Sequence, residues 1–214
     1  MRRLADVEAT LQRLADDRPV FHSEEDFQYA LAWRLHRDFD DVVVRLEYPL
    51  PWGGRRAYAD IWLAPAGGPP GESVVIELKY WKQSLRVTIG REAFVLIDQD
   101  DRDVCRYDFL RDVTRVERLI AEGYARAGAV IALTNDFGYW RAGLPDTNDA
   151  DFRLHEGRRI AGVLRWAPGT GKSTTRGREA DLRLRGEYRP AWRPYSTVAG
   201  GPHRNFRYLF LPVG

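Results

Sequence analysis

The stretch Val74-Val75-Ile76-Glu77-Leu78-Lys79-Tyr80 predicts a buried β-strand that carries two charged side chains. Because side chains alternate between the two faces of a strand, Glu77 and Lys79 share one face while apolar residues line the other. Only three of the 33 basic residues in the chain are lysines, so a lysine at this position is unusual for this composition. The strand is therefore expected to present a carboxylate and an amine side by side.

A second carboxylate, Asp60, lies on a neighbouring predicted strand at 58–63, which a loop rich in glycine and proline connects to the first strand as a hairpin. Hydrolysis of a phosphodiester needs a cation to neutralise the phosphate and activate a water, and Mg²⁺ prefers oxygen ligands. Asp60 and Glu77 are the predicted ligands, and the backbone carbonyl of Leu78 is a third. Lys79 is the predicted catalytic amine, which would hold the attacking water or stabilise the transition state. These residues together indicate a metal-dependent phosphodiesterase.

A helix that precedes both strands adds a further carboxylate. Ser23 is its predicted N-cap, and the helix is expected to end near residue 37. At helical spacing, Glu24 and Gln28 fall beside the apolar stripe, whereas Glu25 points well away from it. Glu24 is therefore a predicted catalytic carboxylate and metal ligand, and Gln28 is a predicted auxiliary residue.

The remaining elements predict an α/β fold with a mixed central sheet that helices cover on both sides. Before residue 150 they are an amphipathic helix at 1–17, a strand at 42–48, helical segments in two pieces from 83 to about 123, and a strand at 129–134. Candidate strands further along are 159–166, 180–189 and 206–213. We expect one domain with an N-terminal helix (1–19), a catalytic core (20–150) and a basic, β-rich C-terminal extension packed on the core (151–214).

Asp60 followed by Glu77-Leu78-Lys79, after a helix that bears Glu24, resembles the PD-(D/E)XK, or restriction-endonuclease-like, nuclease superfamily over about residues 20–135. The resemblance implies an αβββαβ core and Mg²⁺ as the cofactor, with Mn²⁺ as a substitute. It also implies that Asp60, Glu77 and Lys79 hydrolyse a nucleic-acid backbone. Ala59 stands where the superfamily's name has proline, a position without a chemical role in this mechanism.

The resulting prediction is a cytoplasmic, Mg²⁺-dependent nuclease that works in prokaryotic defence or in the processing of mobile elements. The superfamily's usual substrates favour DNA over RNA, and the stretches at 21–33 and 106–110 are similar to uncharacterised bacterial members. One alternative is a catalytically silent nuclease-like module that binds nucleic acid or a protein. Another is an ordinary amphipathic strand on which Glu77 and Lys79 form a weak surface ion pair.

The predicted helical region after Lys79 contributes further candidates. Gln99 and Arg106 are predicted auxiliary residues near the phosphate, because members of the superfamily often place such residues there. Asp108 and Arg115 lie in the same region. The alternative is a helix surface laced with salt bridges, which the mixed charges of this region also favour.

Charge is unevenly distributed along the chain. Residues 153–207 carry thirteen basic residues against four acidic ones, a net charge of +9, which leaves −7 for the rest of a chain whose total is +2. Phosphate contacts supply most of the affinity for nucleic acid that is independent of sequence, so this distribution suits a polyanionic substrate. The candidate contacts are Lys82, Lys172, Arg176 and Arg178. Solvated arginines on exposed strands explain the same charge equally well.

The segment 167–174 is similar to the end of a nucleotide-binding phosphate loop. That motif needs a glycine at position 166, where this chain has Trp166, and a helix after it, which residues 175–178 do not favour. Nucleotide binding is therefore a minor alternative.

Composition also bears on location and partners. Cys105 is the only cysteine, which excludes an internal disulfide and favours a reducing compartment. The longest apolar stretch, about 125–133, is far too short for a membrane span, and the charged helix at 1–17 does not have the pattern of a signal peptide. We expect a soluble protein with no membrane partner, which acts alone, as a homodimer or with a larger system.

Overall fold

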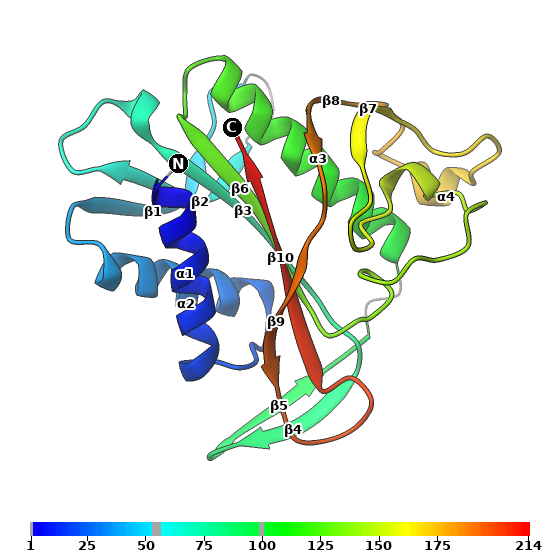
Figure 1. Ribbon diagram of the computed structural model, residues 1–214, viewed down its shortest axis with the longest axis horizontal. Helices are drawn as coiled ribbons and strands as arrows, with labels where there is room; N and C mark the ends of the chain where they lie inside the picture. The colour runs from blue at the N-terminus through cyan, green and yellow to red at the C-terminus, as the bar shows by residue number, and fades with distance from the viewer. Residues whose placement is uncertain (1, 53–56, 99–100) are drawn as a thin grey trace.

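One mixed sheet of six strands organises the part of the chain that the computed structural model describes, residues 2–52, 57–98 and 101–214 (Figure 1). β3 and β6 pair in parallel, and the other neighbours pair antiparallel. In spatial order the strands are β1 (Val42–Pro49), β2 (Tyr58–Pro65), β3 (Val74–Trp81), β6 (Ala127–Thr134), β10 (Asn205–Val213) and β9 (Trp192–Thr197). The predicted α/β class with a mixed central sheet is confirmed.

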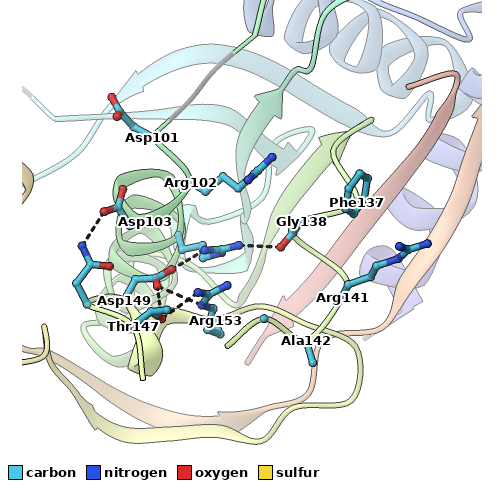
Figure 2. A pocket seen from close by; sticks show the side chains of 13 residues that line it. Asp101, Arg102, Asp103, Phe137, Gly138, Arg141, Ala142, Thr147, Asp149 and Arg153 are labelled. Atoms are coloured by element: carbon cyan, nitrogen blue, oxygen red, sulfur yellow. Dashed lines mark hydrogen bonds and ion pairs between the residues drawn. The ribbon is translucent and has the colours of Figure 1, made fainter. Parts of the chain in front are cut away.

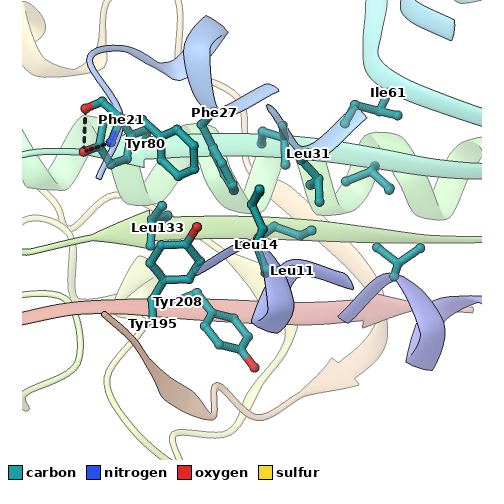
Figure 3. Packing of buried hydrophobic residues seen from close by; sticks show 14 of the residues in the cluster. Leu11, Leu14, Phe21, Phe27, Leu31, Ile61, Tyr80, Leu133, Tyr195 and Tyr208 are labelled. Carbon is teal, nitrogen blue, oxygen red and sulfur yellow. Dashed lines mark hydrogen bonds between the residues drawn. The ribbon is translucent and has the colours of Figure 1, made fainter. Parts of the chain in front are cut away.

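Helices cover both faces of this sheet, so that a separate apolar core forms on each face. The helices are α1 (Arg2–Asp17) and α2 (Glu24–Asp38) on one face and α3 (Arg102–Ala121) on the other. Figure 3 shows Leu11 and Leu14 of α1 close to Leu31 of α2 and to strand residues of the sheet. Each helix buries the apolar stripe that its sequence repeats at helical spacing.

The start of α2 follows the predicted N-cap. Ser23 Oγ accepts a hydrogen bond from the backbone N–H of Asp26 at 3.2 Å, which satisfies one of the free N–H groups of the first turn. Because this cap fixes the first turn, it also fixes the position from which Glu24 leaves the helix.

The parallel pair β3 and β6 lies at the centre of the sheet. β6 is buried along its whole length, as expected for a parallel strand covered on both faces. In β3, the even-numbered residues from Val74 to Tyr80 join the core under α1 and α2, whereas Val75 and Trp81 join the core under α3. Glu77 and Lys79 are also odd-numbered and therefore face α3.

The predicted helical reading immediately after Lys82 is wrong. This segment forms a β-hairpin of β4 (Leu85–Ile89) and β5 (Glu92–Leu96), which projects from one end of the sheet in Figure 1. Alternating apolar residues with β-branched neighbours favour strands here, and Gly90 at a φ of 61° supplies the tight turn between them. The helix predicted for this region begins only at Arg102.

The C-terminal part of the chain contributes to two sheets. β9 and β10 extend the central sheet beyond β6, while β7 (Ile160–Leu164) and β8 (Leu182–Tyr188) form a separate hairpin beside α3. The buried carboxylate of Glu117 on α3 accepts hydrogen bonds from two backbone N–H groups of β8 and from the hydroxyl of Tyr188. Three short helices complete the fold: η1 (Pro70–Glu72), η2 (Ala150–Phe152) and α4 (Lys172–Thr175). The strand β9 was not among the predicted elements.

Candidate active site

β2 separates from β3 at the point where the predicted carboxylates lie. Pairing between these strands runs from Leu63 and Val74 to Ile61 and Ile76 and stops there. The same register would place Asp60 directly opposite Glu77, and residues directly opposite each other in an antiparallel pair share a face. Asp60 and Glu77, although separated in the sequence, therefore occupy neighbouring strand positions on the face that α3 covers.

Two carboxylates take the place of β2 beside β3. Asp60 Oδ2 accepts from the backbone N–H of Leu78 at 2.6 Å, and Glu24 Oε2 accepts from that of Tyr80 at 2.7 Å. A strand that loses its neighbour leaves backbone donors in need of acceptors. The separation of the strands is therefore what brings Asp60 and Glu24 to the same edge of β3.

Glu77 is a fully buried carboxylate with an exposed fraction of 0%. Its Oε2 lies 2.5 Å from Nη2 of Arg115 on α3, but neither carboxylate oxygen has a hydrogen-bond partner of good geometry among the described residues, and Oε1 has no ion-pair partner either. Burial raises the pKa of Glu77 well above its ordinary value, and the nearby Asp112 raises this pKa further, although Arg115 opposes the shift. A buried carboxylate oxygen without a partner is destabilising when it is charged, so this group either keeps its proton or needs a cation beside it.

Lys79 lies beside Glu77 and pairs with α3. Its Nζ is 2.7 Å from Oδ2 of Asp112 and donates to the carbonyl of Leu78 at 3.0 Å. Burial lowers the pKa of Lys79, but the carboxylates of Asp112, Glu24 and Asp60 outweigh this effect, and the net pKa is raised. Lys79 is therefore a protonated cation at neutral pH.

Asp112 is the residue of this cluster that the sequence reasoning missed. It is almost fully buried and contacts both Lys79 and, at 3.4 Å, Arg115. A usable signal was present, because Asp112 occupies a helical position three residues after Phe109 and four before Val116, within the apolar stripe of α3. A carboxylate inside such a stripe needs a cationic partner.

The cluster carries more negative than positive charge. Glu24, Asp60, Glu77 and Asp112 face Lys79 and Arg115, which gives a formal net charge of −2. Burial also raises the pKa values of Glu24 and Asp60, with Lys79 acting in the opposite direction on both. With all four carboxylates ionised, one divalent cation would balance the charge of the cluster.

The oxygen donors of the cluster suit a hard cation that keeps most of its water ligands. Among the described residues, no group of three or more His, Cys, Asp or Glu side chains is arranged to hold a metal ion. Mg²⁺, however, is commonly bound through one or two carboxylates with water completing its octahedron. Asp60, the unpartnered Oε1 of Glu77 and the carbonyl of Leu78 supply oxygen ligands of the kind that such a site needs.

Gln28 lies within the cluster, and Gln99 lies outside the described residues. The side-chain amide of Gln28 is buried and donates to the backbone carbonyl of Asp60 at 2.7 Å and to Oε1 of Glu47 at 2.8 Å. Gln28 thus holds the main chain of a predicted ligand.

Arg106 does not join Glu77 and Lys79 but belongs to a different cluster. Its guanidinium contacts Asp149 at 2.5 Å and donates to the carbonyl of Gly138 at 2.7 Å, beside a cavity of about 590 Å³. In Figure 2, Asp149 of this cavity also lies beside Arg153 and Thr147, and dashed lines join it to both. Four arginines and three aspartates line this cavity, and Arg102 also pairs with Asp136, so the cavity carries little net charge.

The predicted nucleic-acid contacts are spread over the molecule. Lys82 follows β3, with its Nζ 5.5 Å from the ring centre of Tyr80. Lys172 and Arg176 are exposed at the single turn of α4, whereas Arg178 is bound by both carboxylate oxygens of Asp108 at 2.9 and 2.6 Å. Lys172 and Arg176 are therefore better placed than Arg178 to meet a polyanion.

Comparisons with protein-family models, with curated proteins and with solved structures found no match for this chain. In the described ranges, no helix has both the length and the apolar character that a membrane span requires.

Proposed function

We propose that this chain is a metal-dependent nuclease with a restriction-endonuclease-like core made of α2, β1, β2, β3, α3 and β6. The observation that carries the proposal is the buried Glu77, whose Oε1 lacks a partner in a cluster with a formal net charge of −2. The order of these elements supports the same conclusion, since β1, β2 and β3 are antiparallel neighbours and α3 leads to a parallel β6.

The cation in this proposal is Mg²⁺, with Mn²⁺ as a substitute, held by Asp60, Glu77 and the carbonyl of Leu78 with Glu24 in support. When bound, such a cation would neutralise phosphate charge and lower the pKa of a water molecule. Because its pKa is raised, Lys79 would act as a fixed positive charge and hydrogen-bond donor and not as a general base. Its pairing with Asp112 fixes the amine beside the cation site.

The proposed substrate is nucleic acid, with DNA preferred to RNA on the resemblance described above, and the proposed setting is prokaryotic defence or mobile-element processing in the cytoplasm. The exposed Lys172 and Arg176 belong to the basic C-terminal part and would meet the phosphate backbone. Action as a homodimer or within a larger system is compatible with this proposal.

One observation favours a second candidate, a nuclease-like module that binds without cleaving. Arg115 lies 2.5 Å from Glu77, and Lys79 pairs with Asp112. The two buried carboxylates that face α3 or lie on it therefore each have a cation of the protein itself beside them. A module of this kind would keep the fold and the surface charge but gain no stability from Mg²⁺.

The two candidates are separated by a cleavage assay on duplex, single-stranded and branched DNA and RNA, with and without Mg²⁺. We expect Mg²⁺-dependent cleavage of at least one substrate, with losses of several orders of magnitude in Asp60→Ala and Lys79→Ala. Metal-dependent cleavage that survives both substitutions would contradict this site. Glu25→Ala, an exposed change on the first turn of α2, serves as the control.

A further inference from the structure

Glu47, near the end of β1, has a backbone conformation that residues other than glycine rarely adopt. Its φ is 47°, and it is the one non-glycine residue with positive φ in the described part of the chain. Such a conformation is strained and persists only where the surroundings impose it, which occurs most often near functional sites.

The strained residue coincides with the row of carboxylates at the candidate active site. Pairing of β1 with β2 has one constant register from Val42 to Pro49 that would place Glu47 opposite Asp60, but this pair is absent from the ladder. Asp60 in turn would lie opposite Glu77 in the register of β2 and β3. Glu47, Asp60 and Glu77 thus occupy one row across three strands, and the pairing lapses on both sides of Asp60.

β1 changes the face it presents to the sheet at Glu47. Leu46 packs on the core under α1 and α2, whereas Tyr48, only two residues later, belongs with the core under α3 and stacks on Trp62 at a ring-centre distance of 4.4 Å. Strict alternation would put these two residues on the same face. The side chains of β1 therefore change faces at the row of Glu47 and Asp60, which is also where the pairing of β2 with β3 ends.

A single side-chain amide links the strained residue to the predicted ligand. Nε2 of Gln28 donates to Oε1 of Glu47 at 2.8 Å and to the backbone carbonyl of Asp60 at 2.7 Å. Gln28 is buried on α2, which packs against the sheet through Phe27 and Leu31. The side-chain amide of Gln28 is thus anchored on α2 and binds both β1 and β2 at the row of Glu47 and Asp60.

We propose that Glu47 is a positioning residue that acts through Gln28 on Asp60. The two side chains clamp the main chain of Asp60 so that its carboxylate reaches the N–H of Leu78 and shares the face of Glu77. The part of this inference that concerns metal binding rests on the proposed function, whereas the part that concerns the position of Asp60 does not.

The backbone N–H groups of β3 offer a direct test in the metal-free protein. The N–H of Leu78 is held by Asp60 and reports the clamp, while the N–H of Tyr80 is held by Glu24 and serves as an internal control. Amide hydrogen exchange of both groups is measured by NMR in wild type, Glu47→Gly, Glu47→Gln and Gln28→Ala, with Glu25→Ala as the surface control.

Glu47→Gly separates the side chain from the backbone strain, because glycine adopts positive φ without penalty and keeps the turn of β1. We expect exchange at Leu78 to rise about 10-fold in Glu47→Gly and in Gln28→Ala, as for the loss of one hydrogen-bonded support, while Tyr80 stays within about 2-fold. Glu47→Gln keeps an acceptor oxygen for Gln28 and should leave Leu78 near the wild-type rate. Unchanged exchange at Leu78 in both Glu47→Gly and Gln28→Ala would overturn the proposal. Glu47 would then only twist the edge strand β1.

Mn²⁺ affinity supplies the second readout. We expect it to fall about 10-fold in Glu47→Gly and Gln28→Ala, which is typical for the loss of a group that orients a metal ligand. If wild type itself binds no Mn²⁺, the proposed function fails while the exchange result still decides the positioning role. If Mn²⁺ binds equally well to wild type and to both variants, the clamp has no role in ligand placement.

Discussion

Lys79 on β3 and Asp112 on α3 form an ion pair in which Nζ and Oδ2 are 2.7 Å apart. This pair joins the strand that carries the predicted nuclease residues to the helix that covers them. Because Asp112 is also 3.4 Å from Arg115, one buried carboxylate orders both cations of the site. The position and charge of Lys79 therefore depend on a residue outside the sequence motif.

Asp112→Asn should weaken the site without changing its shape. The amide keeps the size of the carboxylate but removes the strongest influence that raises the pKa of Lys79, whose own burial lowers it. We expect the free energy of unfolding to fall by about 2 kcal/mol, since one partner of a largely buried pair is lost, and cleavage to slow roughly 10-fold or more because the amine is less well held. Urea denaturation and single-turnover cleavage measure the two effects.

The matched control for this change is Asp108→Asn, which removes an ion-paired carboxylate from the same helix at a more exposed position. It should leave the cleavage rate within about 2-fold of wild type, because no contact joins it to Lys79. Equal rates for Asp112→Asn and wild type would mean that Asp112 does not position the amine.

Arg115→Met should make the metal-free protein less stable and more responsive to Mg²⁺. Without Arg115, the buried Glu77 loses the cation 2.5 Å from its Oε2. We expect a loss of about 2 kcal/mol in the absence of metal, or a fall in Tm of roughly 4–8 °C, and a larger gain on adding Mg²⁺ than wild type shows. Thermal unfolding with and without Mg²⁺ tests this, with Arg118→Met as the exposed control; identical Mg²⁺ gains would count against a shared site.

Glu77 should contribute to the stability of the metal-free protein at low pH and less as pH rises. Burial raises its pKa above the ordinary value of 4.5, so the folded protein keeps this proton more tightly than the unfolded chain. The contribution to stability is then fully present below pH 4.5 and is lost as pH rises toward the folded-state pKa. Glu77→Gln should remove this part of the pH dependence in denaturant titrations, and a variant that follows the wild-type curve would refute the assignment.

Removing two exposed cations should weaken nucleic-acid binding without altering its sequence preference. In the double variant Lys172→Ala/Arg176→Ala, two phosphate contacts would be lost, and the slope of log K against log salt concentration should fall by about 2 in magnitude. Fluorescence anisotropy over a range of salt concentrations measures the slope. Arg86→Ala, an exposed change on β4, should leave it unchanged. An unchanged slope in the double variant would exclude the α4 turn from the interface.

Local patterns were sufficient to predict the elements that hold the site. The alternation in β3 correctly placed Glu77 and Lys79 on one face, and Ser23 correctly marked the start of α2. Both features depend on neighbours a few residues away, which sequence periodicity reports directly. The predicted helix after Lys82 is wrong, because the β-branched alternation and the Gly90 turn of this segment favour a hairpin.

The contacts that complete the site could not be read from local patterns. Asp112 pairs with Lys79, and Glu47 reaches Asp60 only through Gln28, so each depends on how a helix packs against the sheet. The strain at Glu47 has no local signature either, because glutamate is not a residue that favours positive φ. These contacts follow from tertiary packing, which the spacing of residue types along a single sequence does not predict.

Anomalous diffraction from crystals soaked in Mn²⁺ tests the proposed metal site directly, because it locates the bound ion. We expect one strong peak at oxygen-ligand distance from Asp60, from Oε1 of Glu77 and from the carbonyl of Leu78, with Lys79 retained beside Asp112. The absence of a peak at these residues, with Arg115 as the sole cation on Glu77 at saturating Mn²⁺, would contradict the proposed site.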